Sequence, residues 1–237
     1  MAPRSPRVHD GSMSMLPVLA LLVFAGTAAL AGCDGDGGDA DAGACPGALD
    51  AGTPFPVSIR LANKRAANVY LGQLMPGCAS GPGFTLEDAS GHKLNHSPDV
   101  CDRTCAELQL SSCACEADCA APTVTLVAPG GHVDLPWAGW IFVDATMPAE
   151  CYADPACVGP TCLVPVTPSR PLTVRATAHA EVAGCSGACI DCTPDASGSC
   201  IVPGATTVGG TAIEATGTWT NVQPSDAGAV AAEVDFE

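Results

Sequence analysis

The chain has 237 residues, with 25 Asp or Glu against 9 Lys or Arg, which gives a formal net charge of −16 at pH 7. A surface this acidic repels phosphates and anionic lipid headgroups, so nucleic acid is not expected as a partner. Gly (26 residues) and Pro (21 residues) are frequent, but stay below the level of disordered low-complexity chains. A folded, turn-rich protein is therefore expected.

The N-terminal region has the layout of an export signal. Arg4 and Arg7 precede an apolar stretch at residues 16–31, which leads into the run Leu30-Ala31-Gly32-Cys33. This run resembles the lipobox of bacterial lipoproteins. The resemblance implies cleavage before Cys33, attachment of a diacylglycerol to its thiol and acylation of the new amino terminus, with palmitate as an expected fatty acid.

The alternative for this stretch is a transmembrane helix. An uncleaved span needs about 20 apolar residues, whereas residues 16–31 are fewer and include Pro17, Gly26 and Thr27. Lipoprotein processing is therefore the preferred interpretation, and two or more acyl chains would make the attachment stable. Asp34 follows the cysteine; because an Asp there retains lipoproteins in the inner membrane only in some bacteria, the resemblance leaves inner and outer membrane open.

Composition divides the chain into parts. The segment after the expected cleavage site is rich in Asp, Gly and Ala and cannot bury enough apolar surface to fold. We therefore predict a signal peptide at residues 1–32, a lipidated flexible tether at residues 33–54 and a disulfide-rich β domain at residues 55–237.

Short runs of alternating apolar and polar residues in the third part predict β-strands. The clearest are residues 57–61 and 230–237, each with one apolar and one polar face. Ala89-Ser90-Gly91 separates two such runs, as in a hairpin with a short loop. The best helix candidate begins at Thr104, where Glu107 completes a capping-box spacing, and would span one or two turns. Further strands are expected at residues 68–71, 123–127, 131–135, 140–143, 172–178 and 211–220.

About eight or nine short strands without alternating helices predict an all-β fold, an antiparallel β-sandwich with immunoglobulin-like topology and disulfide-rich loop insertions. The hairpin at residues 86–91, Pro129-Gly130, Trp137, Gly139 and residues 171–176 occur in an order that resembles bacterial immunoglobulin-like domains, including a proteinase-inhibitor type. The resemblance implies the sandwich and makes proteinase inhibition an alternative function. The cysteines have no counterpart in that pattern.

Cysteine usage predicts disulfide bonds. Of the 15 cysteines, Cys33 is assigned to lipid and the others, an even number, fall between Cys45 and Cys200. In an exported chain this indicates up to seven bridges, with about 10⁵ possible pairings, so the connectivity stays open. The insertions that hold most of these cysteines are candidate binding surfaces. The predicted disulfide cysteines are Cys45, Cys78, Cys101, Cys105, Cys113, Cys115, Cys119, Cys151, Cys157, Cys162, Cys185, Cys189, Cys192 and Cys200.

Metal binding is the main alternative interpretation of the cysteines. Cys101-x3-Cys105 and Cys189-x2-Cys192 have spacings that suit structural zinc in a reducing compartment. Outside the cytosol thiols oxidise to disulfides, so neither a metal nor another cofactor is expected. No βαβ pattern surrounds the second pair, and the chain has no Gly-x-Ser-x-Gly or His-Glu-x-x-His motif, so no enzyme activity is expected.

Trp137 and Trp140 flank Gly139 at a predicted bend and are candidate contact residues for a protein or glycan partner. The preferred interpretation is nevertheless that the tryptophans, Trp219 included, anchor the core of the sandwich, since buried tryptophan commonly fills such cores. The sequence thus predicts a protein of the bacterial cell envelope, anchored to the membrane through Cys33 and acting as a non-catalytic interaction or structural module. A metal-binding envelope protein and a proteinase inhibitor are the alternatives.

Overall fold

The computed structural model describes Cys45 and residues 56–72, 83–99, 101–115, 121–187, 191–220 and 230–237. All of them belong to one of the two units into which the chain divides, Asp41–Glu237. Cys33, the signal peptide predicted at residues 1–32 and, except for Cys45, the tether predicted at residues 33–54 lie outside the described residues. The predicted domain boundaries therefore stay predictions. Among the described helices, none is long and apolar enough to cross a membrane.

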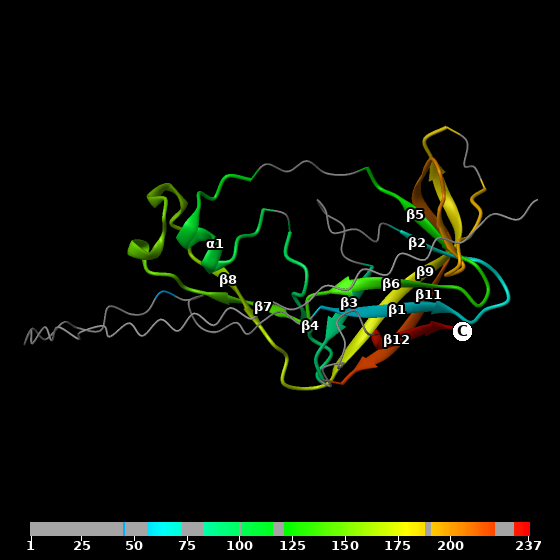
Figure 1. The fold of residues 1–237 in the computed structure, drawn as a ribbon, viewed down its shortest axis with the longest axis horizontal. Coiled ribbons are helices and arrows are strands. Elements are labelled where there is room, and N and C mark those ends of the chain that lie inside the picture. Colours follow the sequence, from blue (N-terminus) through cyan, green and yellow to red (C-terminus); the bar gives the residue numbers. More distant parts are fainter. Residues whose placement is uncertain are drawn as a thin grey trace, which may run out of the picture. The chain divides into compact units, whose positions relative to one another are not determined.

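Strands dominate the described part of the chain and form three sheets (Figure 1). The first sheet has the order β12-β1-β6, in which the central strand pairs antiparallel with β6 and parallel with β12. A separate two-stranded sheet joins β7 and β8 in antiparallel register. The bounds of these strands are β1 (Val57–Asn63), β6 (His132–Trp137), β7 (Ile141–Ala145), β8 (Cys162–Val166) and β12 (Val230–Phe236).

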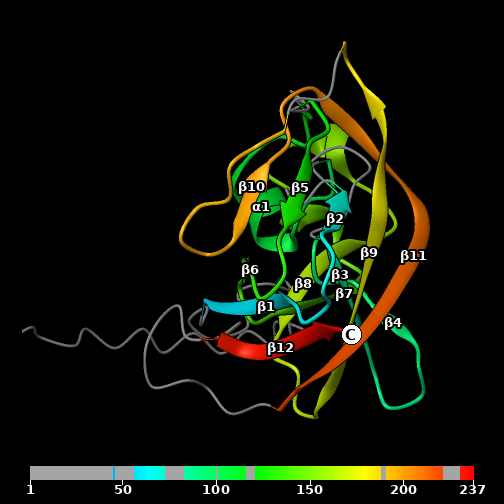
Figure 2. The same ribbon diagram turned by 90° about the vertical axis from the view of Figure 1, so that its right-hand side faces the viewer.

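The second sheet has seven strands and is built around the long strand β9 (Leu172–Cys185). Antiparallel pairing of β9 with β11 (Ala205–Trp219) runs nearly the whole length of both strands and makes the long curved ribbon seen in Figure 2. The other strands follow the order β10-β5-β2-β9-β3-β4. Their bounds are β2 (Val69–Gly72), β3 (Phe84–Glu87), β4 (Lys93–Leu94), β5 (Val124–Val127) and β10 (Ser199–Ile201).

The two larger sheets share one hydrophobic core, to which both contribute their inward-facing side chains. Strand β12 shows how the sequence builds it, because Ala232, Val234 and Phe236 are buried while Glu233 and Glu237 are exposed. This alternation is the pattern expected of a sheet with one solvated face. The predicted all-β, sandwich-like fold is therefore confirmed.

Two turns share the same five-residue geometry, and only the first, in the β3–β4 hairpin, was predicted. In Asp88–His92, the side chain of Asp88 accepts hydrogen bonds from the backbone N–H groups of Ser90 and His92, at 2.8 and 3.0 Å. Asp195 accepts in the same way from Ser197 and Ser199, at 2.8 and 3.4 Å. The hydroxyls of Ser90 and Ser197 also donate to these carboxylates, and together with the backbone N–H groups they lower the pKa of both carboxyl groups. The second turn leads directly into β10.

The strand prediction failed where side-chain alternation is lost. Strand β11 begins at Ala205, six residues before the expected start. The prediction missed its first part because a register shift between Gly209 and Ala212 interrupts the alternation of side chains. Gly210 has a φ of 72° within this irregularity, a conformation that favours glycine. Strands β8 and β10 were not predicted. The helix was predicted correctly, and α1 (Cys105–Leu110) has the complete capping box.

Candidate functional site

Four of the five disulfides with both cysteines described lie in one region outside the sandwich core. We call residues 101–115 and 143–166, together with Cys45, the disulfide lobe. It contains α1, β8, the end of β7 and two single-turn 3-10 helices, η1 (Ala149–Cys151) and η2 (Pro155–Cys157). Its small core consists largely of half-cystines, together with Leu108, Met147 and Tyr152. The four disulfides are Cys45–Cys151, Cys101–Cys115, Cys105–Cys162 and Cys113–Cys157.

The fifth described bridge, Cys192–Cys200, lies outside the lobe. Cys185 is also disulfide-bonded. The predicted disulfide bonding is thus present in the described residues. Cys78, Cys119 and Cys189 lie outside the described part of the chain.

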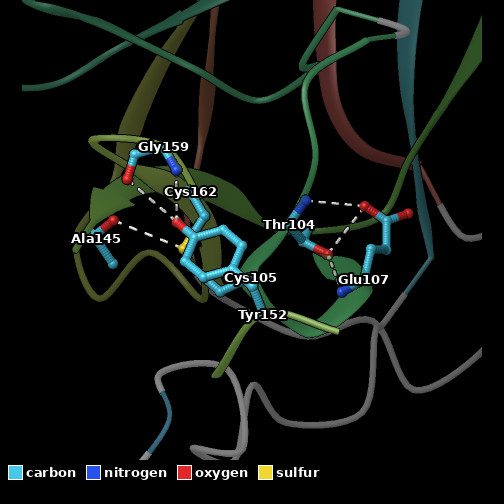
Figure 3. The surroundings of a disulfide bond; sticks show 7 residues. All are labelled: Thr104, Cys105, Glu107, Ala145, Tyr152, Gly159 and Cys162. Carbon is cyan, nitrogen blue, oxygen red and sulfur yellow. Dashed lines mark hydrogen bonds between the residues drawn. A yellow bond between two sulfur atoms is a disulfide. The ribbon is translucent and has the colours of Figure 1, made fainter. Parts of the chain in front are cut away.

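Helix α1 is held by its cap and by its first residue. Thr104 Oγ1 accepts from the backbone N–H of Glu107 at 3.2 Å, and Glu107 Oε2 accepts from the backbone N–H of Thr104 at 2.8 Å. A helix of six residues is marginal on its own. The disulfide between Cys105 and Cys162 joins the helix to the start of β8 (Figure 3). This covalent link stabilises a helix that is too short to be stable through its own hydrogen bonds.

One exposed loop of the lobe is fixed at both ends. We call residues 157–162 the clamped loop. Cys157 and Cys162 are both buried, and each is bonded to a cysteine of the 101–115 segment. Between them, Val158 is 48% exposed, and its backbone leaves the helical conformation of η2, with φ −58° and ψ 115°.

Tyr152 fixes the middle of the clamped loop. Its side chain is buried, and its hydroxyl donates to the carbonyl oxygen of Gly159 at 3.3 Å. The same hydroxyl oxygen accepts from the N–H of Gly159 at 3.4 Å. Figure 3 shows the ring reaching past Cys162 to this residue. Both backbone groups of Gly159 are therefore engaged by one side chain.

A second candidate is a groove of about 730 Å³ on the polar face of the seven-stranded sheet. Arg175 donates to both carboxylate oxygens of Glu87, at 3.0 and 3.1 Å, and this pairing lowers the pKa of Glu87 and raises that of Arg175. Glu214 accepts from Thr177 at 2.8 Å. Arg175 and Glu214, which line the groove, are thus engaged within the sheet, and Phe84, Ala176 and Val208 make much of the remaining lining apolar.

The structure separates the two predicted contact tryptophans. Trp137 is 4% exposed and belongs to the sandwich core, as does Trp219. Trp140 is half-buried, and its carbonyl oxygen accepts from the indole N–H of Trp137 at 2.8 Å. Trp137 and Trp219 therefore have the core-packing role that was the preferred prediction for the tryptophans.

The cysteines with zinc-like spacings have other partners. Cys101 and Cys105 belong to two different disulfides, and Cys192 is bonded to Cys200. Within the described residues, no group of three or more His, Cys, Asp or Glu side chains is placed to hold a metal ion. His96 is largely buried against Phe84, with ring centroids 4.6 Å apart, and burial lowers its pKa.

Sequence reasoning missed Tyr152, Val158 and Gly159. The available signal was the spacing Cys157-x4-Cys162, which predicted disulfides without saying which side chains the bridges would expose. Comparison of the chain with family models, with curated proteins and with solved structures gave no match. Function is therefore inferred from the chain's own residues.

Proposed function

We propose that the protein is a lipid-anchored component of the bacterial cell envelope that acts as a non-catalytic interaction or structural module. Its sandwich has immunoglobulin-like topology in this proposal, and the disulfide lobe provides the contact surface. The observation that carries the proposal is the oxidised state of the eleven described cysteines. Disulfides persist in oxidising compartments and are rare in the cytosol, which agrees with the export signal predicted at residues 1–32.

A contact role is supported by what the lobe exposes. Leu110 at the end of α1 is 85% exposed, and Val143 and Val158 are 42% and 48% exposed. These are three of the five large apolar side chains that are exposed in the described residues. Exposed apolar side chains on a rigid frame favour protein contacts over charged ligands.

Lipid attachment is tested by expressing the full chain in a bacterial host with a clickable palmitate analogue in the medium. The wild-type chain is expected to take up the label and to sediment with membranes, while Cys33→Ser does neither. Thiol titration of the denatured, unreduced wild-type protein is expected to find the described cysteines oxidised. An unlabelled wild-type protein in the cytosol with free thiols would contradict the proposal.

A further inference from the structure

We infer that the clamped loop is a protease-binding loop, in which Val158 enters the specificity pocket of a serine endopeptidase that prefers small aliphatic residues. The inference deepens the proposed function and rests on it, because the loop has its shape only in the oxidised protein. It names the partner class as an extracytoplasmic endopeptidase and the contact as reversible inhibition.

Shape and chemistry at Val158 lead to this partner. The side chain is exposed and its backbone is no longer helical, with φ −58° and ψ 115°, whereas Cys157 and Cys162 at the two ends of the loop are buried. The loop is thus convex at Val158 and fits a concave partner. From Cys157 to Cys162 the sequence CVGPTC has no charged residue, although the chain as a whole is strongly acidic. In serine proteases the specificity pocket selects one side chain of the bound segment, and a small apolar pocket selects residues such as Val.

Rigidity distinguishes an inhibitor loop from a substrate loop. Asp154 caps η2 by accepting from the N–H of Ala156 at 2.9 Å, and Pro155 begins that helix. Disulfides then fix both ends of the loop, and Pro160 restricts the chain after Gly159. A segment already held in its bound conformation loses little entropy on binding, which increases affinity. Tight protease complexes with rigid inhibitors show little backbone movement.

The same contacts oppose cleavage. Hydrolysis of the Val158–Gly159 bond would add one water and leave a carboxylate on Val158 and an amine on Gly159. Tyr152 holds the nitrogen of Gly159, and the bridges to Cys105 and Cys113 keep both cut ends in place. The reverse condensation, which releases the same water, then benefits from the high effective concentration of tethered reactants.

The test uses the processed full-length protein, purified in detergent without reductant and assayed against pancreatic elastase, chymotrypsin and trypsin. We expect the wild type to inhibit elastase and not trypsin. Val158→Arg is expected to lose at least about 100-fold in elastase inhibition, because a guanidinium would be buried in an apolar pocket, and to gain inhibition of trypsin, whose pocket is acidic. Ile201→Arg, at an exposed apolar position of strand β10 outside the lobe, is the matched control and should leave elastase inhibition unchanged.

Tyr152→Phe tests whether the rigidity of the clamped loop, and not only the exposure of Val158, protects the loop from cleavage. This variant keeps the buried ring and removes both hydrogen bonds to Gly159, so elastase should cut the Val158–Gly159 bond about tenfold faster than in the wild type. Thermal unfolding of each variant confirms that the fold is retained.

Three results would overturn the inference. In the first, neither the wild type nor Val158→Arg inhibits any of the proteases. In the second, Val158→Arg still inhibits elastase as well as the wild type does. In the third, elastase rapidly cleaves the wild type after Val158, as it would an ordinary substrate. Palmitate labelling of Cys33 is read separately, so a failed inhibition assay with a labelled protein rejects the protease partner and leaves the envelope role standing.

Discussion

The indole rings of Trp137 and Trp219 meet edge to face in the sandwich core, with centroids 5.2 Å apart and ring planes at 78°. Trp137 ends β6 of the three-stranded sheet, and Trp219 ends β11 of the seven-stranded sheet. One aromatic pair therefore joins the two layers. Aromatic residues make up only 4% of the chain, so few other side chains could fill this space.

Replacing Trp219 with Ala should lower the free energy of unfolding by about 3 to 5 kcal/mol, because it leaves a large cavity and removes the aromatic contact. Urea unfolding followed by circular dichroism measures the loss. Trp140→Ala is the matched control, since Trp140 is only half-buried and should cost clearly less. Equal losses in the two variants would contradict the assignment of Trp219 to the core.

Asn63, at the end of β1, is the most deeply buried polar residue in the described part of the chain. Its Nδ2 donates to the carbonyl oxygens of Ala67 and Val127, each at 2.9 Å, and its Oδ1 accepts from the N–H of Arg65 at 3.0 Å. Asn63→Ala should cost about 3 kcal/mol, because buried backbone groups lose their partners. Urea unfolding checks this value. Asn68→Ala, at an exposed position, should change stability by no more than about 0.5 kcal/mol.

The double replacement of Cys105 and Cys162 by Ala should unfold the lobe locally. The bridge spans 57 residues, and closing a loop of this length contributes about 4 kcal/mol in the chain-entropy model. Amide hydrogen exchange should show lost protection in α1 and β8 with the sandwich strands still protected. Ala at Cys192 and Cys200 is the control, because that bridge spans 8 residues and should affect only its own loop. Global unfolding in the first variant would show that the lobe and sandwich are not separable.

The ion pair of Glu87 with Arg175 makes stability depend on acid pH. The hydrogen bonds from Arg175 hold the pKa of Glu87 below its ordinary value of 4.5. The stabilisation is therefore fully present above that value and is lost as the pH falls through the folded-state pKa. Glu87→Gln should flatten the acid limb of a stability profile measured from pH 6 to pH 3. A Glu87 pKa at or above its ordinary value, measured by NMR, would exclude this source of pH dependence.

Sequence reasoning succeeded where the signal is local. The alternation in β12 and the capping box of α1 involve residues within a few positions of each other, and both predictions are confirmed. The Asp195 turn repeats the Asp-Ala-Ser-Gly sequence of the Asp88 turn and could have been found by comparing the two.

What escaped prediction depends on tertiary contacts. Disulfide pairing has too many combinations to be chosen without a fold, so the partners of Cys105 and Cys157 could not be assigned. The hydrogen bond between Tyr152 and Gly159 joins residues seven positions apart in irregular chain, and no periodicity or motif in the sequence predicts it. Beyond Ala178, the residues of β9 are exposed or half-buried without alternation, which removes the pattern that would have extended the strand.

The bridge from Cys45 to Cys151 decides how mechanical load enters the molecule. Tension applied to any residue before Cys45 crosses the covalent bond between the two sulfurs and arrives at η1. A pull on the amino terminus is therefore transmitted to the lobe through this covalent link for as long as the bridge stays oxidised.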